Sequence, residues 1–323
     1  MTRPTFNSCF SSLISEYLDY KSDNGFEEES YYLGLKKFDR FLVSIKKTTE
    51  SFTREDGELW RVKSDEESSF AYYRRITISH GFIFFLNSLN KDVYLFRKIP
   101  YPNSNFIPHI YTKDEIERYF EAVDTYPFRE WKDRLQMPII CRILYSSGTR
   151  IGETLQIRKK DVDLEKGIIK LIHTKNKKHR YIVLSDSMKD LFKLFADKCF
   201  YQLNDNDLIF TTRNGTKIEE NKFHKKHTDI LREARIPFSG SNEGPRVHDW
   251  RHTFVVYSLL KMQEEGRDMQ NSIYYLIKYL GHKSITQTEK YIHLAERINA
   301  SVKEDFASLV DCLFKEEGLA NEE

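Results

Sequence analysis

A proline-rich segment about one third of the way along the chain most constrains the fold. Residues 99–108 read Ile-Pro-Tyr-Pro-Asn-Ser-Asn-Phe-Ile-Pro. Three prolines in ten residues exclude a continuous helix and favour extended backbone. A chain of 323 residues is long enough for two domains. We therefore expect a first domain at 1–98, a linker at 99–111 and a second domain at 112–323.

The first hundred residues show the spacing of a helical bundle. Apolar side chains recur at helical intervals in residues 6–20, 29–46 and 68–90. Between the last two, residues 50–68 are polar and acidic with Trp60 isolated, which predicts a loop or a short ordered excursion. The aromatic stripes can fill a core or stack on nucleic-acid bases, and filling a core is the commoner use.

The second domain combines helical patterns with a short stretch of strand patterns. Thr112 and Glu115 form a capping box that opens a helix. The fold class predicted is mainly α (α+β): a helical bundle, then a mostly helical domain with a small antiparallel sheet. The expected helices are 131–146, 186–199, 219–234, 252–264 and 272–280, and the expected strands are 168–172, 181–184 and 208–210.

Bulk properties exclude several classes of protein. The net charge is only +2, so any basic surface must come from local clustering. The four cysteines have no zinc-finger spacing, which predicts reduced structural thiols. No signal-peptide pattern opens the chain, and no apolar run approaches the roughly 18 residues of a membrane span. We expect a cytoplasmic protein without membrane association.

Four separated motifs carry residues suited to phosphate chemistry. A histidine and an arginine three positions apart share one helix face, although such pairs are usually surface or capping residues. The motifs must therefore be weighed together. They are Gly148-Thr-Arg150-Ile-Gly-Glu153, Lys175 in a basic hairpin, His248-Asp-Trp-Arg251, and Gly281-His282 followed by Tyr291-Ile-His293.

In this order the motifs resemble the catalytic domain of tyrosine recombinases, the phage integrase and Xer-type family, over about residues 112–295. An attacked phosphodiester gathers negative charge, which two guanidiniums can hold, and Arg150 and Arg251 fit that use. The resemblance implies that Tyr291 is the nucleophile. A phenol of pKa about 10 needs nearby cations or a base for this. Trp250 stands where the family often has leucine.

The resemblance implies roles for four further side chains. His248 is the candidate base, and Lys175 the candidate donor of a proton to the leaving 5′-oxygen. His282 is expected to hydrogen-bond the scissile phosphate, and Glu153 to orient the arginines and the histidine. No metal and no other cofactor is implied. Several residues compete with these or lie beside them: Lys177 and Lys178 for the lysine, Tyr274, Tyr275 and Tyr279 as phenols more typical of core, and His252 and His293 as structural or supporting residues.

A basic stretch flanks the proposed phosphate site. Residues 158–180 hold nine Lys or Arg against three acidic residues. Such a run is often only a solvated face, but here it favours contacts to the DNA backbone. The acids Asp161 and Asp163 could suggest a metal site, although their turn-like setting favours a surface loop. The predicted DNA-contacting residues are Arg158, Lys159, Lys177, Lys178 and Arg180.

The same resemblance implies partners and a biological setting. The expected partner is double-stranded DNA with specific recombination sites, bound by a nucleoid-associated homo-tetramer. An apolar stripe from Phe306 to Phe314 fits a C-terminal helix that is exchanged between subunits or closes its own core. Integration for a phage or mobile element is the first expectation. The alternatives are a Xer-like dimer resolvase, a type IB topoisomerase-like enzyme, a catalytically idle DNA-binding regulator and a metal-dependent nuclease.

Overall fold

The computed structural model describes residues 5–26, 28–102, 107–172, 179–240 and 244–281. The chain divides into two compact units, Met1–Asn105 and Phe106–Glu323. The division falls inside the segment expected to be a linker. Among the described residues, no helix is long and apolar enough to cross a membrane.

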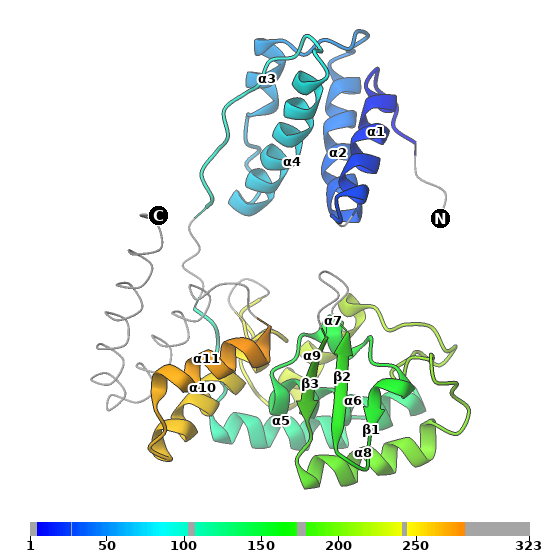
Figure 1. Cartoon of the computed structure of the whole chain (residues 1–323), viewed down its shortest axis with the longest axis vertical. Helices are drawn as coiled ribbons and strands as arrows, with labels where there is room; N and C mark the ends of the chain where they lie inside the picture. Colours follow the sequence, from blue (N-terminus) through cyan, green and yellow to red (C-terminus); the bar gives the residue numbers. More distant parts are fainter. Residues whose placement is uncertain (1–4, 27, 103–106, 173–178, 241–243, 282–323) are drawn as a thin grey trace. The chain divides into compact units, whose positions relative to one another are not determined.

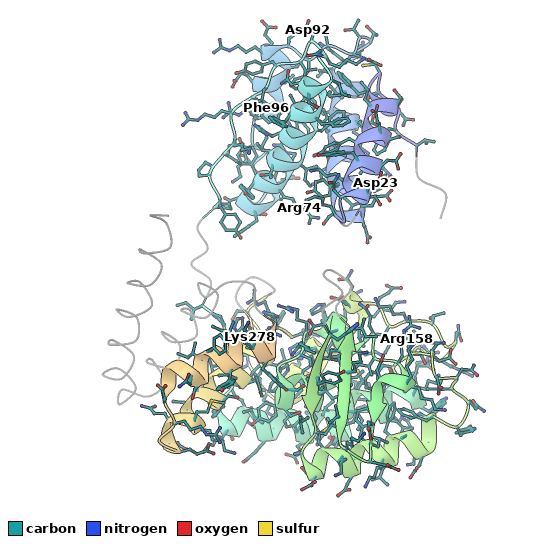
Figure 2. All side chains as sticks on the ribbon, viewed as in Figure 1. Asp23, Arg74, Asp92, Phe96, Arg158 and Lys278 are labelled. Carbon is teal, nitrogen blue, oxygen red and sulfur yellow. The ribbon has the colours of Figure 1, made fainter. Side chains whose placement is uncertain are left out.

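The first unit is a helical bundle. In it α2 packs against α1 and α4, and α1 also contacts α4 (Figure 1). Phe10, Phe38 and Phe82 are fully buried in the core, and Phe96 closes it from the segment after α4 (Figure 2). The aromatic stripes of this unit thus fill its core. Its helices are α1 (Ser11–Asp23), α2 (Glu28–Ser44), α3 (Arg54–Trp60) and α4 (Ser69–Ser88).

Helix α3 is the short ordered element that was one of the two expectations for residues 50–68. Thr53 and Asp56 form a capping box that starts the helix. Trp60 is buried, its Nε1 donates to the Ser79 hydroxyl at 2.8 Å, and the Arg75 guanidinium lies 4.4 Å from its ring centre. The Thr-x-x-Asp signal was present in the sequence, but the run of acidic residues after it obscured the helix.

The second unit is mostly helical with a small antiparallel sheet, which confirms the predicted fold class. Helix α6 is central, because it packs against α5, α8 and α10. A cis peptide bond joins Gly244 and Pro245 just before α10. The helices are α5 (Lys113–Thr125), α6 (Trp131–Ser147), α7 (Ile151–Thr154), η1 (Lys159–Asp161), α8 (Asp186–Cys199), α9 (Glu220–Glu233), α10 (Asp249–Glu264) and α11 (Met269–Leu280).

The sheet has the order β1-β2-β3, with antiparallel neighbours (Figure 1). Its strands are β1 (Val162–Asp163), β2 (Ile168–Ile172) and β3 (His179–Val183). Ile169 pairs with Ile182, and both are fully buried. The strand expected at 208–210 is instead a bent segment, in which Ile209 and Phe210 are buried and Leu208 forms one isolated bridge with Arg158.

The end of the expected linker belongs to the packed structure of the second unit. Tyr111 is fully buried, and its ring stacks on Trp250 with centroids 3.9 Å apart and planes 3° apart. Its backbone N–H donates to the Thr253 hydroxyl at 3.1 Å. Tyr111, the last residue of the expected linker, is therefore held against α10 by these two contacts.

The packing around Trp250 accounts for a tryptophan where the family often has leucine. It is fully buried among Tyr111, Tyr119, Phe120 and Tyr145. We expect Trp250→Leu to destabilise the protein by about 2–4 kcal/mol, since a smaller side chain leaves a cavity. Chemical denaturation measures this.

The control for that substitution is Trp131→Leu, because the Trp131 side chain is 51% exposed at the start of α6. Its expected effect is within about 0.5 kcal/mol. Equal effects of the two substitutions would contradict the packing argument.

Candidate active site

Arg150 is presented by a sharp turn between α6 and α7. Helix α6 ends at Gly148, whose φ of +57° lies in the left-handed region. A Cβ on Gly148 would lie 2.5 Å from a ring carbon of Phe254, so glycine is required for packing as well as for conformation. Arg150 follows as the N-cap residue of α7. The Ser-Gly-Thr-Arg sequence thus fixes the backbone position from which the Arg150 side chain extends.

Glu153 joins two arginines from different elements. One carboxylate oxygen accepts from the Arg150 guanidinium at 2.8 Å. The other accepts from the Arg150 backbone N–H at 3.1 Å and from the Arg180 guanidinium at 2.5 Å. This geometry is consistent with the predicted orienting role, and it adds Arg180 to the group.

The charge of Glu153 is stabilised by these partners. Burial alone would raise the pKa of Glu153, but Arg180 and Arg150 outweigh it and hold the pKa at about 2, below the ordinary 4.5. A carboxyl whose pKa is depressed on folding stabilises the folded state above its unfolded value. That contribution is lost as the pH falls from about 4.5 towards about 2.

Arg251 is buried in the first turn of α10, and its side chain lies between the C-terminal ends of α6 and α11. One terminal nitrogen donates to the Gly148 carbonyl and the other to the Leu280 carbonyl, both at 2.8 Å. The residue is 1% exposed. Arg251 therefore ties the end of α6 to the end of α11, and its predicted grip on a phosphate stays a prediction.

His248 immediately precedes α10; part of the residue is exposed to solvent, while its ring lies among protein atoms. The protein packed around the ring, together with the charges of Arg251 and Arg150, lowers the pKa of His248 from 6.5 to about 4. The imidazole is therefore neutral at pH 7, as a proton acceptor must be. The ring of His252 lies 4.9 Å away, nearly perpendicular to it.

The chain around His248 is held by an ion pair between the half-buried Arg246 and the buried Asp249. Asp249 is fully buried, and its carboxylate accepts from the Arg246 backbone N–H at 2.8 Å and from the Arg246 guanidinium at 3.2 Å. The sequence reasoning missed both residues. An acidic residue at the first position of a helix, three after an arginine, is a signal that could have found them.

Three residues predicted to contact DNA have partners within the protein. The Lys159 ammonium donates to the carbonyls of Phe200 and Leu203, at 3.2 and 2.7 Å. Arg158, labelled in Figure 2, donates to the Asn206 carbonyl at 2.5 Å. Arg180 is nearly buried against Glu153. These contacts give each of the three a partner in the fold, and the DNA contacts predicted for them stay predictions.

The two acidic residues near the sheet, Asp161 and Asp163, stabilise backbone turns. Asp161 is buried and accepts from the Arg158 backbone N–H at 3.2 Å, while Asp163 accepts from the Lys166 backbone N–H at 3.0 Å. Within the described residues, no group of three His, Cys, Asp or Glu side chains could hold a metal ion.

Two of the three tyrosines of α11 lie outside the core that the sequence suggested for them, whereas Tyr279 packs against it. Tyr274 and Tyr275 are exposed. Tyr279 is partly buried against Phe254, and burial raises its pKa although Arg180 and Arg251 oppose that shift. A phenol with a raised pKa is a poor nucleophile at neutral pH. The remaining predicted site residues lie outside the described residues and stay predictions: Lys175, Lys177, Lys178, His282, Tyr291 and His293, together with the stripe at 306–314.

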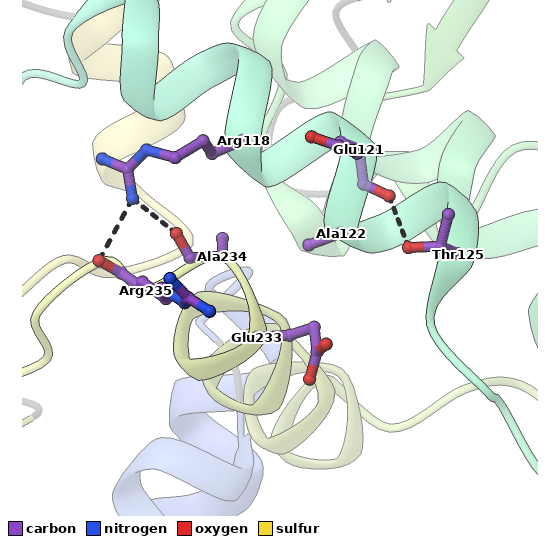
Figure 3. Close-up of a pocket in the computed structure, with 7 residues that line it drawn as sticks. All are labelled: Arg118, Glu121, Ala122, Thr125, Glu233, Ala234 and Arg235. Carbon is purple, nitrogen blue, oxygen red and sulfur yellow. Dashed lines mark hydrogen bonds between the residues drawn. The ribbon is translucent and has the colours of Figure 1, made fainter.

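A separate hollow of about 290 Å³ lies between α5 and the end of α9 (Figure 3). Arg118 crosses it and donates to the carbonyls of Ala234 and Arg235, at 2.5 and 3.1 Å. None of its seven lining residues was predicted as a site residue. The hollow is a junction between helices, and the candidate site is the group around Arg150, His248 and Arg251.

The sequence is similar to integrases and recombinases along most of its length. A sequence model of the phage integrase family matches residues 110–297. The putative integrase/recombinase y4rB of Sinorhizobium fredii is 23% identical over 294 residues, which cover 88% of this chain and 93% of the relative. The tyrosine recombinase XerC of Staphylococcus saprophyticus is 24% identical over 271 residues, 82% and 86% of the two chains.

Solved structures share the fold. The XerH site-specific recombinase bound to difH substrate matches with a TM-score of 0.64 at 19% identity, over 82% of this chain and 76% of that one. A lambda integrase dimer bound to a COC′ core site matches with a TM-score of 0.62 at 14% identity, over 87% and 94%. Because the family model spans more than half of the sequence, the chain belongs to the phage integrase family of tyrosine recombinases.

Proposed function

We propose that this protein cuts and rejoins DNA strands at specific sites through a 3′-phosphotyrosyl intermediate formed by Tyr291. One observation carries the proposal. Arg150 from α7 and Arg251 from α10 lie near enough to His248 that both guanidiniums lower the pKa of its imidazole. Two cations and a neutral base around one point match the needs of attack on a phosphodiester.

The first chemical step follows from these groups. The guanidiniums of Arg150 and Arg251 would hold the non-bridging oxygens and offset the charge that develops at phosphorus. The Tyr291 hydroxyl gives its proton to His248 as its oxygen bonds to phosphorus. The bond from phosphorus to the 5′-oxygen breaks, and that oxygen takes a proton from Lys175. His282 would hydrogen-bond the same phosphate. Since the new ester conserves the energy of the broken bond, the reverse reaction rejoins a strand.

The biological role that we propose is integration for a phage or mobile element. The similarity to the y4rB integrase/recombinase and to the Tn1549 transposon integrase, with a TM-score of 0.59 for the latter, supports this. The XerC and XerH relatives support a second candidate, resolution of chromosome or plasmid dimers. The DNA recovered in the experiment below separates the two, because element ends and dimer-resolution sites occupy different genomic contexts.

The proposed partner is double-stranded DNA, and the proposed assembly is a homo-tetramer on two sites. A solved lambda integrase is a tetramer bound to a Holliday junction, and it matches this chain with a TM-score of 0.61. We further propose that the apolar stripe at 306–314 docks on a neighbouring subunit. Deleting residues 302–323 should then prevent assembly on the recovered site, whereas normal assembly would contradict the exchange.

Covalent capture tests the function and requires no defined target sequence. The full-length protein is incubated with nicked fragments of the source genome, then denatured and filtered to retain DNA bound through covalent bonds. Sequencing identifies the DNA, and mass spectrometry of the digested adduct identifies the attached residue. We expect attachment at Tyr291, undiminished by a chelator. Absence of any adduct contradicts the proposal, and cleavage without an adduct that a chelator abolishes would favour a metal-dependent nuclease.

Tyr279→Phe tests whether the phenol of α11 or that of Tyr291 is the nucleophile. We expect this variant to form the adduct at the wild-type rate within about twofold, because the Tyr279 phenol is partly buried and its pKa is raised. The measurement is adduct yield against time on the recovered duplex. Loss of the adduct with an unchanged melting temperature would identify Tyr279, instead of Tyr291, as the nucleophile.

A further inference from the structure

Arg180 is buried where the sequence suggested a surface contact. On β3, His179 and Tyr181 are exposed while Ile182 is buried, so Arg180 shares the inward direction of Ile182. Its side chain is 9% exposed. A buried guanidinium needs partners, and Arg180 has two: the Glu153 carboxylate at 2.5 Å and the Tyr279 carbonyl at 2.9 Å.

The first partner leads to the proposed phosphate site. Glu153 accepts from Arg180 with one oxygen and from the Arg150 guanidinium with the other. The rotamer of Arg150 therefore depends on where Glu153 is held, and Arg180 holds it from the sheet. Without Arg180, one carboxylate oxygen keeps only the backbone N–H of Arg150 among these contacts.

The second partner leads to the end of α11. Arg180 donates to the Tyr279 carbonyl, and Arg251 donates to the next carbonyl, that of Leu280. The Arg180 Cδ also lies 3.8 Å from the position of a Cβ on Gly281. Gly281 has a φ of +66° and precedes His282 in the sequence. Two arginines thus fix the point from which the predicted His282 and Tyr291 segment starts.

We infer that Arg180 is a positioning residue that aligns Arg150 through Glu153 and anchors the end of α11 for strand cleavage. The inference rests on the proposed function. Arg180 touches no reacting atom in this arrangement, and it acts through the groups that do. A direct DNA contact is the competing interpretation, but the guanidinium is enclosed by Glu153 and Tyr279.

The electrostatics give the inference a signature beyond stability. Among the described residues, the charged or titratable groups around Glu153 include Arg180 from β3, Arg150 at the start of α7 and His248 before α10. The Glu220 carboxylate of α9 lies against Gly152. Arg180 contributes most to the low pKa of Glu153. Removing its charge takes away the largest of the influences that lower the pKa of this buried carboxyl, so the pKa of Glu153 must rise.

The test uses two variants and a matched control in the full-length protein. Arg180→Gln removes the charge, and Arg180→Lys keeps it but cannot contact both partners with one planar group. The control is Arg142→Gln, which removes another two-pronged ion pair, since Arg142 donates to both Asp124 oxygens at 2.7 and 2.6 Å. The substrate is the duplex recovered by covalent capture.

We expect adduct formation by Arg180→Gln to fall by about 10²-fold, because small displacements of reacting groups cost about that much. The acidic limb of its pH–rate profile should move to higher pH, and the Glu153 carboxyl ¹³C resonance should titrate at higher pH than in the wild type. In Arg180→Lys the acidic limb of the pH–rate profile should return to its wild-type position, while adduct formation stays slower than in the wild type. Arg142→Gln should lose thermal stability alone.

The outcomes separate the two proposals. Wild-type adduct with an unchanged rate and limb in Arg180→Gln overturns the positioning role and leaves the proposed function standing. A loss of rate matched by Arg142→Gln, without a moved limb, makes Arg180 merely structural and also overturns the inference. Absence of adduct from the wild type overturns the proposed function, and the inference falls with it.

Discussion

Tyr291→Phe is expected to abolish the covalent protein–DNA adduct completely. A phenyl ring has no oxygen to bond to phosphorus, and no rearrangement of Arg150 or Arg251 can replace that atom. Binding to the recovered duplex should remain at the wild-type level, because phosphate contacts by basic side chains provide most of the affinity for DNA. Denaturing gels measure the adduct, and native gel shifts measure the binding.

Two results would contradict this prediction. An adduct that persists in Tyr291→Phe would assign the chemistry to another nucleophile, which peptide mapping would identify. Loss of DNA binding together with the adduct would mean that position 291 acts in folding or assembly. Tyr279→Phe is the matched control, since it removes a phenol in the α11 segment that contacts Phe254.

Arg251→Lys is expected to produce the second largest effect, on both activity and stability. A lysine keeps the positive charge, but a single ammonium cannot donate to Gly148 and Leu280 as the forked guanidinium does at 2.8 Å each. Each buried carbonyl left without its donor costs about 1–3 kcal/mol. Adduct formation should fall by about 10²–10³-fold, the loss typical of removing one group that stabilises transition-state charge.

The control for this substitution is Arg142→Lys, where the guanidinium bonds a carboxylate on the exposed side of α5 and α6. Its rate of adduct formation should remain at the wild-type value. If Arg251→Lys were equally active, charge alone would suffice at this position. The two hydrogen bonds from the Arg251 guanidinium to the Gly148 and Leu280 carbonyls would then have only a structural role.

Patterns that depend on near neighbours were predictable from the sequence. Helical spacing indicated the bundle and most helices of the second unit, and the Thr112 capping box is present with both of its hydrogen bonds. The residue order around Arg150 and His248 indicated the family, which the comparison over residues 110–297 confirmed. These features are local, so the sequence contains them in full.

Features that depend on distant contacts were not predictable in the same way. Arg251 depends on carbonyls 103 and 29 residues away, and nothing in its own motif indicates either. Arg180 lay in a basic stretch that suggested DNA contacts, yet the pairing of β2 with β3 turns it inward. Tyr274 and Tyr275 lie in an apolar run that suggested core, although the packed side of α11 is formed by Ile273, Leu276 and Leu280.

Arg180 and Arg251 together form a clasp, in which each guanidinium donates to one of the last two carbonyls of α11. This clasp has a consequence for how such a sequence can vary. The polar turn between α10 and α11 comes earlier in the chain, and the clasp holds the far end of the second helix. Residues inserted into that turn would bulge outward and leave Gly281 in place. Evolution could thus lengthen the turn freely, while a single residue inserted between Gly281 and Tyr291 would change the reach of the nucleophile.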